Sequence, residues 1–378
     1  MVSVPDTSTH ETDSVQLITP EGAFAPNAAA EEFLPYVERL SGDQLRHFYR
    51  EMTVIRRFDA EAGHLQRQGQ LGMWVPSLGQ EAAQVGSGFA ARAQDSIFPA
   101  YREHAVGKIR GLDLIHLLRV FRGVTHGGWV PADTGNFHLY TLVIGSQTLH
   151  ATGYAMGISL DGAPTGDPEK DEAVLVYFGD GSTSQGDTNE AFIWATSYQT
   201  PQVFFLQNNH WAISVPVERQ SRTPLVDRAR GFGLRSTRVD GNDVLASYAV
   251  TAKQLDDARS GHGPGFIEAL TYRLGAHTSS DDPTRYRANE ELAAWEKRDP
   301  VVRYRHYLET SGTADDAFFT QVDEEAADFA ADIRRRTLEI EEPGIGRIFD
   351  NVYTEDHPLM REQKRWLEEY EAAMGGER

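Results

Sequence analysis

Residues 173–209 read AVLVYFGDGSTSQGDTNEAFIWATSYQTPQVFFLQNN, and this stretch decides the fold. It holds two short apolar runs, 173–178 and 202–207, which are separated by a glycine-rich turn and by a segment, 187–198, suited to a helix. Short apolar runs that alternate with helices are typical of buried parallel strands. Because a crossover of this kind returns the second strand beside the first, we expect both strands to end at the same edge of one sheet.

The same alternation continues toward the C-terminus, and helical patterns flank it on both sides. Ser41 and Gln44 have the spacing of a capping box at the start of a helix. The further expected helices cover residues 41–69, 80–91, 112–121, 225–231, 244–259, 290–297, 301–309 and 315–340, and the further expected strands cover residues 234–239 and 266–272. The sequence therefore predicts an α/β fold, with a parallel sheet, helices on both of its faces and extra helices at the N- and C-terminal ends.

The expected organisation is a single α/β domain over residues 36–375, with helical decoration at 36–135 and at 289–375. Residues 1–35 are rich in Ala, Thr, Ser, Pro and Glu and show little apolar periodicity. We therefore expect them to form a flexible arm or an arm that wraps a partner.

Composition excludes several classes of protein. The chain of 378 residues has a net charge of −20, which argues against nucleic-acid binding because phosphate backbones require clustered Lys and Arg. It contains no cysteine, which excludes disulfides, zinc–thiolate sites and cysteine nucleophiles. No apolar run approaches the roughly 18 residues of a membrane span, and the first 35 residues contain no Lys or Arg. We therefore expect a cytoplasmic protein that has no membrane segment.

Polar side chains follow both strands of the opening stretch. Gly179, Asp180 and Gly181 come directly after the first strand, and Asn209 follows the second. Glycines allow backbone N–H groups to approach a phosphate at a helix start, whereas a carboxylate and an amide supply the hard oxygens that Mg²⁺ prefers. One carboxylate suits an ion that also carries a diphosphate, because a second carboxylate would add repulsion. The pair of strand ends predicts a magnesium and diphosphate site.

The glycine-rich turn by itself is open to other interpretations. A lone Gly-Asp-Gly is common and would by itself indicate an ordinary turn. A dinucleotide site requires the spacing G-x-G-x-x-G and an acidic residue after the next strand, and neither is present. A phosphate-binding loop of the P-loop type requires Gly-Lys-Ser/Thr, which is also absent. The specific signal is the two strand ends at this spacing.

The quoted motif resembles that of thiamine-diphosphate-binding proteins, and longer runs resemble one family. GDGSTSQGDTNEAF, QNNHWAISVPVERQ, SLGQEAAQVG, FPAYREH and YRLGAHTSSDDPTRYR are similar to the alpha subunit of the decarboxylating first component of bacterial 2-oxo acid dehydrogenases. The resemblance covers roughly residues 40–375 in family order. It implies the thiamin diphosphate-binding fold and the cofactors thiamine diphosphate and Mg²⁺.

The resemblance also implies roles for individual residues. Asp180, Asn209 and the backbone carbonyl of Trp211 would bind Mg²⁺. The other cofactor contacts would come from Gly181 and Ser182 by backbone N–H groups, from Tyr101 and Arg102 on the diphosphate, and from Leu142 and Ile144 at the aminopyrimidine. The implied catalytic residues are His126 near the substrate, His277 at the diphosphate and in acyl transfer, and Tyr286 and Arg287 in the loop that presents the lipoyl group.

Two positions depart from the family pattern. Gln207 stands where animal branched-chain relatives carry Arg, which removes one possible contact to phosphate. His210 and Trp211 replace the Gly or Arg and the Tyr or Phe that commonly follow the Asn pair. A backbone ligand tolerates this change, but the wall of the pocket can differ.

The resemblance implies an incomplete active site and a particular reaction. Activation of the cofactor requires a carboxylate from a second α/β domain, and the chain after residue 272 is too short and too helical to form one. We expect a beta subunit to supply it in an α2β2 tetramer, with a lipoyl-bearing acyltransferase as the next partner. The expected reaction is oxidative decarboxylation of a branched-chain 2-oxo acid such as 3-methyl-2-oxobutanoate. The alternatives are the same chemistry on pyruvate and, more distantly, a non-catalytic assembly subunit.

Overall fold

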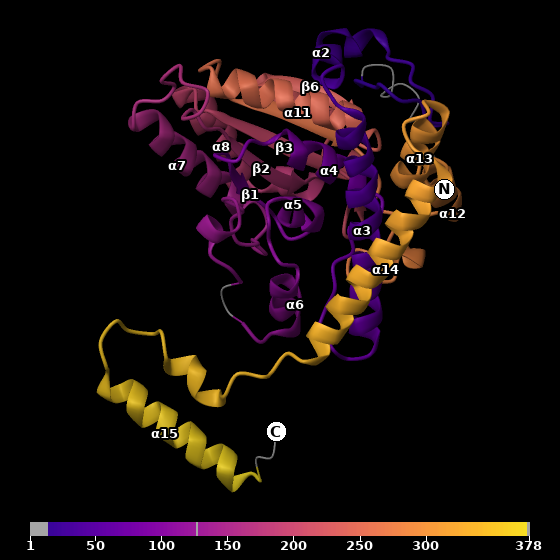
Figure 1. The fold of residues 1–378 in the computed structure, drawn as a ribbon. Helices are drawn as coiled ribbons and strands as arrows, with labels where there is room; N and C mark the ends of the chain where they lie inside the picture. Colours follow the sequence, from indigo (N-terminus) through magenta and orange to yellow (C-terminus); the bar gives the residue numbers. More distant parts are fainter. Residues whose placement is uncertain (1–13, 126–127, 376–378) are drawn as a thin grey trace. The chain divides into compact units, whose positions relative to one another are not determined.

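The core of the molecule is a parallel sheet of five strands. The computed structural model describes residues 14–125 and 128–375. The strands lie in the order β1 (Ser96–Phe98), β2 (Val174–Gly179), β3 (Gln202–Asn208), β7 (Gly265–Leu270) and β6 (Arg235–Asp240), and all neighbouring pairs are parallel. The predicted parallel sheet with helices on both faces is confirmed (Figure 1).

Alternate residues of the strands point to opposite layers of helices. Val176, Phe178, Phe204 and Phe266 share one buried cluster with residues of α7 (Ser146–Leu160), α8 (Gly186–Tyr198) and α10 (Leu225–Gly231). The opposite face packs against α11 (Val244–Arg259) and α4 (Glu81–Ala90), where the Tyr177 hydroxyl bonds Ser87 Oγ at 2.7 Å. Because both faces are covered, β2 and the middle of β3 are apolar and show no alternation with polar residues, whereas the edge strand β6 reads RSTRVD.

The remaining helices surround this layered core. The capping box at Ser41 is present, with Ser41 Oγ accepting from the Gln44 N–H and the Gln44 side chain accepting from the Ser41 N–H. The other elements up to residue 338 are η1 (Ala28–Phe33), α2 (Leu34–Val37), α3 (Gly42–Arg67), α5 (His104–Ile109), α6 (Ile115–Arg122), η2 (Pro131–Asp133), η3 (Asp180–Ser184), β4 (Trp211–Ala212), β5 (Val215–Pro216), α9 (Val217–Gln220), η4 (Pro283–Arg285), α12 (Asn289–Glu296), α13 (Pro300–Thr310) and α14 (Asp316–Leu338). None of the helices in the described ranges combines the length and apolarity needed to cross a bilayer.

The structure corrects the expected N-terminal arm and divides the chain near its C-terminal end. Residues 14–35 are not a flexible arm, because Val15 pairs with Val239 beside the sheet and the Asp243 carboxylate accepts the N–H groups of Leu17 and Ile18. The first 13 residues of the expected arm lie outside the described residues. At the C-terminal end, Leu338–Arg378, with η5 (Ile345–Phe349) and α15 (Pro358–Ala373), form one compact unit, and Met1–Thr337 form the other.

Several elements were absent from the sequence prediction, and β1 and α7 show why. Strand β1 has only three residues, too few to show a period, and it is recognised as a strand by its pairing with β2. Helix α7 is rich in Gly, Ala, Ser and Thr and therefore shows little contrast between its faces. Its buried residues become evident only where it packs on β2 and α8.

The crossing of α4 over α11 requires a glycine. A Cβ on Gly86 would lie 2.5 Å from the backbone oxygen of Val244 and 2.8 Å from the Tyr248 nitrogen. These neighbours are backbone atoms of another helix, so they cannot move aside as the end of a flexible side chain could. Gly86 therefore sets how closely α4 packs against α11.

We expect Gly86→Ala to lower the stability of the chain by about 1–3 kcal/mol, because the added methyl overpacks a helix contact. Gly63→Ala on α3 is the matched control, since a Cβ there meets only the end of the Arg67 side chain at 3.7 Å. The control should leave stability unchanged or raise it by up to about 1 kcal/mol through helix propensity. Thermal unfolding measures both variants, and equal midpoints for the two would refute the packing argument.

Candidate active site

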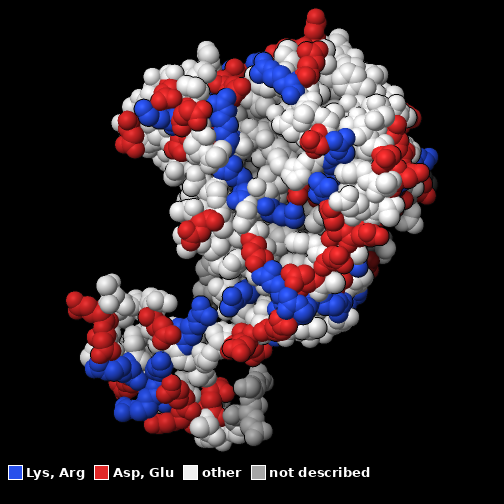
Figure 2. Space-filling view, viewed as in Figure 1, with Lys and Arg blue, Asp and Glu red and all other residues white. Residues whose placement is uncertain are grey.

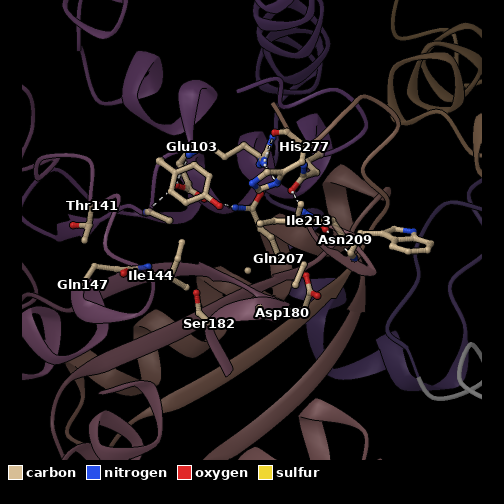
Figure 3. Close-up of a pocket in the computed structure, with 18 of the residues that line it drawn as sticks. Glu103, Thr141, Ile144, Gln147, Asp180, Ser182, Gln207, Asn209, Ile213 and His277 are labelled. Carbon is tan, nitrogen blue, oxygen red and sulfur yellow. Dashed lines mark hydrogen bonds between the residues drawn. The ribbon is translucent and has the colours of Figure 1, made fainter. Parts of the chain in front are cut away.

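A pocket lies at the carboxyl ends of β2 and β3. Gly179 of β2 is level with Gln207 of β3, so the next residues of both strands emerge at the same edge of the sheet. Asp180 begins η3 directly after β2, Asn209 follows β3, and both line the pocket, whose cavity volume is about 260 Å³. Figure 3 shows Asp180 and Ser182 on the sheet side of the pocket and Glu103 and His277 on the opposite side. The expected meeting of the two strand ends is confirmed.

Asp180 is a buried carboxylate with one amide partner. It is 1% exposed, and its Oδ2 accepts a hydrogen bond of 2.6 Å from Gln220 Nε2. Burial raises the pKa of Asp180 to about 6, because the charged form loses its hydration there. A bound cation would supply the missing counter-charge and lower that pKa.

The turn after β3 holds Asn209 and narrows the pocket. Asn209 Oδ1 accepts from the Trp211 N–H at 3.3 Å, and its Nδ2 donates to Gln80 Oε1 at 3.3 Å. Two residues of this turn adopt left-handed backbone, His210 at φ 70° and the β-branched Ile213 at φ 54°. Such conformations are strained for these residue types, and strain of this kind clusters at ligand sites. Ile213 itself lines the pocket.

The donor set fits a divalent cation that carries a phosphate group. Among the described residues no group of three or more His, Asp or Glu is placed to hold a metal ion, so an ion at Asp180 would need oxygens from its ligand or from water. A Cβ on Gly181 would lie 2.9 Å from Ala212 Cβ, so only glycine leaves that backbone close to the turn. Gln80 Nε2 and Gln220 Oε1 are buried without a hydrogen-bond partner in the described part of the chain, which leaves an amide donor and an acceptor available.

The opposite wall carries positive charge within an acidic protein. On the face shown in Figure 2, acidic and basic side chains are interspersed, and the chain as a whole has a charge of −20. Inside the pocket wall, however, Arg102 donates to the carbonyl of Pro76 and, at 3.1 Å, to the carbonyl of His277. Arg273 also approaches His277, with Nη1 3.4 Å from its Nδ1, and donates to the carbonyls of Trp211 at 3.1 Å and Ile213 at 2.7 Å. Two guanidinium groups held by neutral acceptors favour an anionic ligand.

A buried carboxylate supports the turn that presents Tyr101 and Arg102. Glu103 Oε2 accepts the backbone N–H groups of Ala100 at 2.8 Å and Arg102 at 3.2 Å. Its Oε1 accepts from Gln207 Nε2 at 2.6 Å, so the residue that departs from the family's Arg is an uncharged partner of Glu103. Burial raises the pKa of Glu103.

His277 is held as a neutral ring. Its Nδ1 lies 3.3 Å from Arg102 Nη2 and 3.4 Å from Arg273 Nη1, and a guanidinium nitrogen can only donate. Nδ1 must therefore accept, which places the ring proton on Nε2. Burial, and then the charges of Arg102 and Arg273, lower the pKa of His277 to about 4.

The structure brings together most, but not all, of the residues that the sequence singled out. Tyr101, Arg102, Ile144, Asp180, Gly181, Ser182, Asn209, Trp211 and His277 all line the pocket. Leu142 does not line it and is exposed. Tyr286 and Arg287 also lie outside its lining and instead brace the loop, where the Tyr286 hydroxyl donates to Asp281 and Arg287 donates to the carbonyl of Leu274 at 3.0 Å. His126 lies outside the described residues.

Several lining residues were not predicted. They come from segments that lie far apart in the sequence: Gln80, Glu103, Thr141, Gln147, Gln207 and Ile213. Four of them lie in the quoted motifs: Gln80 in SLGQEAAQVG, Glu103 in FPAYREH, and Gln207 and Ile213 in QNNHWAISVPVERQ. The others belong to the pocket because of the path of the chain.

The fold and the pocket define an α/β protein with a cavity at a sheet edge, lined by Asp180, Asn209 and Arg102, with Arg273 beside the lining residue His277. The family model described as the dehydrogenase E1 component matches residues 49–337. The chain belongs to this family of thiamine-diphosphate-dependent 2-oxo acid dehydrogenases.

Two relatives illustrate how far the similarity extends. The 3-methyl-2-oxobutanoate dehydrogenase subunit alpha of Mycobacterium tuberculosis (strain ATCC 25618 / H37Rv) is 42% identical over 357 residues, which cover 94% of this chain and 93% of the relative. The pyruvate dehydrogenase E1 component subunit alpha of Bacillus cereus is 38% identical over 316 residues, which cover 83% of this chain and 81% of the relative. Both relatives are alpha subunits that this chain matches over most of its length.

The structure predicts that His277 titrates with a midpoint near pH 4 in the chain without cofactor and carries its proton on Nε2 at neutral pH. Histidine in the unfolded chain titrates near 6.5. The stability that neutral His277 contributes is therefore complete above about pH 6.5 and is lost as the pH falls toward 4. NMR of ¹⁵N-labelled histidine measures both the tautomer and the midpoint. Arg102→Met should move the midpoint upward, and a wild-type midpoint at or above 6.5 would contradict the arrangement.

Proposed function

We propose that this chain is the alpha subunit of a 2-oxo acid dehydrogenase that oxidatively decarboxylates a branched-chain 2-oxo acid, such as 3-methyl-2-oxobutanoate, and passes the acyl group to the lipoyl group of an acyltransferase. The observation that carries the proposal is the meeting of Asp180 and Asn209 in one pocket opposite Arg102 and His277. The alternative is the same chemistry on pyruvate. The Mycobacterium relative favours the branched-chain substrate, and the Bacillus relative keeps pyruvate open.

The residues on the sheet side would hold the cofactor's diphosphate through Mg²⁺. Asp180 supplies the charged ligand, Asn209 an amide oxygen and Trp211 its backbone carbonyl, which keeps a second lone pair although it already accepts from Arg273. The backbone N–H groups of Gly181 and Ser182 would donate to the diphosphate. Because Mg²⁺ prefers six oxygens, the diphosphate and water complete the set.

The residues of the opposite wall would grip the diphosphate and shape the cofactor. Arg102 offers a planar fork that matches phosphate oxygens, and Tyr101 lies beside it. Leu142 and Ile144 would meet the aminopyrimidine, Ile144 from the pocket wall. Leu142 would do so through its backbone, since its side chain lies outside the lining.

Bound thiamine diphosphate supplies the carbon that attacks the 2-oxo group and takes up the electrons released with CO₂. This chain's contribution is to bind, orient and exclude water. Neutral His277, with a proton on Nε2, can donate to the diphosphate or to the acyl oxygen during transfer. His126 would lie near the substrate, and Tyr286 and Arg287 would keep the loop in the form that receives the lipoyl group.

A beta subunit completes the proposed enzyme. The described chain contains one parallel sheet with a cofactor edge, and the carboxylate that activates the cofactor would come from a second α/β domain. The proposed assembly is α2β2, followed by a lipoyl-bearing acyltransferase. A cytoplasmic location belongs to the same proposal, since the relatives are bacterial dehydrogenases and the chain has no cysteine.

A non-catalytic assembly subunit is the more distant alternative. A subunit that had lost its activity would be expected to lose charged ligands, whereas Asp180, Asn209, Arg102 and His277 all line one pocket. Binding of thiamine diphosphate to the complex with its beta subunit distinguishes the two possibilities.

We expect calorimetric titration of the αβ complex to show thiamine diphosphate binding that requires Mg²⁺ and disappears with a chelator. Asp180→Asn should weaken this binding by more than the roughly 10- to 100-fold that loss of an outer-shell partner costs, because it removes the one charged ligand. Asp187→Asn, an exposed carboxylate seven residues along the chain, should leave binding unchanged. Binding that is insensitive to both the chelator and Asp180→Asn would overturn the assignment.

The substrate is tested by steady-state rates on 3-methyl-2-oxobutanoate and on pyruvate, with the beta subunit present. We expect kcat/KM to favour the branched substrate. One methylene in an apolar pocket is worth about 1–3 kcal/mol, or roughly 10- to 200-fold. A preference for pyruvate of that size would select the alternative.

A further inference from the structure

A buried carboxylate on α3 (Gly42–Arg67) has no part in the chemistry described above. Asp59 is 5% exposed, and each of its oxygens accepts a hydrogen bond from a neutral donor. Oδ1 accepts from the indole Nε1–H of Trp74 at 2.7 Å, and Oδ2 accepts from the backbone N–H of Ser77 at 3.0 Å. Burial raises the pKa of Asp59 to about 7, so the carboxylate is costly where it lies and calls for an explanation.

Both donors belong to segment 74–79, on which the His277 loop rests. The backbone of Trp74 is joined to Ser279 in both directions, since Ser279 N–H donates to the Trp74 carbonyl at 2.9 Å and Trp74 N–H donates to Ser279 Oγ at 3.0 Å. Leu274 N–H donates to the Leu78 carbonyl at 3.1 Å. The loop therefore lies on this segment on both sides of His277.

The contact between the segment and the loop leaves little room for adjustment. A Cβ on Gly275 would lie 3.3 Å from the Pro76 ring. The Arg102 guanidinium donates to the carbonyls of both Pro76 and His277. It therefore joins the pocket wall to segment 74–79 and to the His277 loop. A shift of segment 74–79 would thus displace His277 and the acceptors of Arg102 together.

The Trp74 ring is held in its orientation by the aromatic rings around it. It is 1% exposed, stacks on His104 at 4.7 Å and meets Phe58 and Phe121 edge-on at 5.5 and 5.2 Å. These contacts fix the plane of the indole and direct its Nε1–H at the carboxylate. The carboxylate therefore fixes one end of the segment through a side chain and its middle through the backbone.

We propose that Asp59 is a positioning residue. By accepting hydrogen bonds from Trp74 and Ser77, it holds segment 74–79, and through this segment the His277 loop, in the position that acyl transfer requires. The proposal rests on the proposed function in its assignment of the loop to acyl transfer. The physical link from Asp59 to the loop stands on the hydrogen bonds alone.

Asp59→Asn tests the link with almost no change in shape. Both partners of Asp59 are donors, and an amide offers only one acceptor oxygen, so one N–H would face the amide N–H₂ and remain unsatisfied. Asp171→Asn is the matched control, because Asp171 is also 5% exposed and accepts the backbone N–H groups of Thr165 and Gly166, yet lies before β2 at the amino edge of the sheet.

The first readout is amide hydrogen exchange of the αβ complex in peptides spanning residues 272–282. We expect Asp59→Asn to speed exchange there by about tenfold, the effect of one lost buried hydrogen bond, and Asp171→Asn to leave these peptides unchanged. Equal exchange in the two variants would overturn the proposal, whatever reaction the enzyme catalyses.

The second readout compares the rate of acylation of a lipoyl domain with the rate of 2-oxo acid oxidation by an artificial electron acceptor. We expect Asp59→Asn to lower the ratio of acylation to oxidation about tenfold, while Asp171→Asn leaves it unchanged. An unchanged ratio in Asp59→Asn would refute the role in acyl transfer. Failure of the wild-type complex to oxidise any 2-oxo acid would refute the proposed function, and hydrogen exchange would still decide the link.

A second substitution guards against a variant that fails to fold. Trp74→Phe keeps an apolar ring and removes the Nε1–H, so exchange in the loop should rise in the same direction as in Asp59→Asn. In the double variant, the side-chain oxygen of Asn at position 59 accepts from the Ser77 N–H. Its amide N–H₂ no longer faces the indole N–H, so no donor is opposed to another donor. The double variant should therefore exchange more slowly than Asp59→Asn alone, and additive effects of the two substitutions would contradict the proposed pairing.

Discussion

The parallel pairing of β2 with β3 is the constraint on which the site depends. Its register places Gly179 beside Gln207, so the chain leaves both strands at one level and turns in the same direction. The helices on both faces exclude water from this pairing, which makes each backbone hydrogen bond obligatory and a slip of register costly. Asp180 and Asn209 meet because neither strand can move against the other.

The second wall of the pocket has a different origin. It consists of Tyr101, Arg102 and His277. These residues lie in turns and loops, and hydrogen bonds to other turns and loops hold them in position. Glu103 holds the turn of Arg102, and segment 74–79 supports the loop of His277. The sheet side of the pocket is thus rigid by regular structure, and the opposite side is rigid by a network of single hydrogen bonds.

Charges in and beside the pocket favour a ligand that carries both signs of charge. Asp180 is a buried carboxylate bonded to an amide, and Arg273 is 1% exposed, with an Nε that has no hydrogen-bond partner in the described part of the chain. Charges held in this way are costly without counter-charges. A cation beside Asp180 and an anion beside the guanidinium groups would offset both costs at once, and a magnesium-bound diphosphate has that pair of charges.

Local interactions were determined by the sequence itself. Helices α10 and α11 cover the predicted residues, the capping box at Ser41 is present, and β2 and β3 lie within a residue of their predicted limits. Each depends on neighbours a few residues apart, so its signal is contained in a short window. The motif residues Asp180, Asn209, Arg102 and His277 were likewise identified by their immediate context.

Only the tertiary structure decided the interactions that join distant segments. Strand β1 exists because β2 pairs with it, residues 14–35 are ordered because Asp243 accepts their N–H groups, and Gln80 reaches the pocket because α4 crosses α11 at Gly86. The exposed Leu142 and the bracing role of Arg287 follow from the same long-range packing. Such pairings close loops of tens to hundreds of residues. Their free energy depends on the whole fold, and no local pattern of residue types records it.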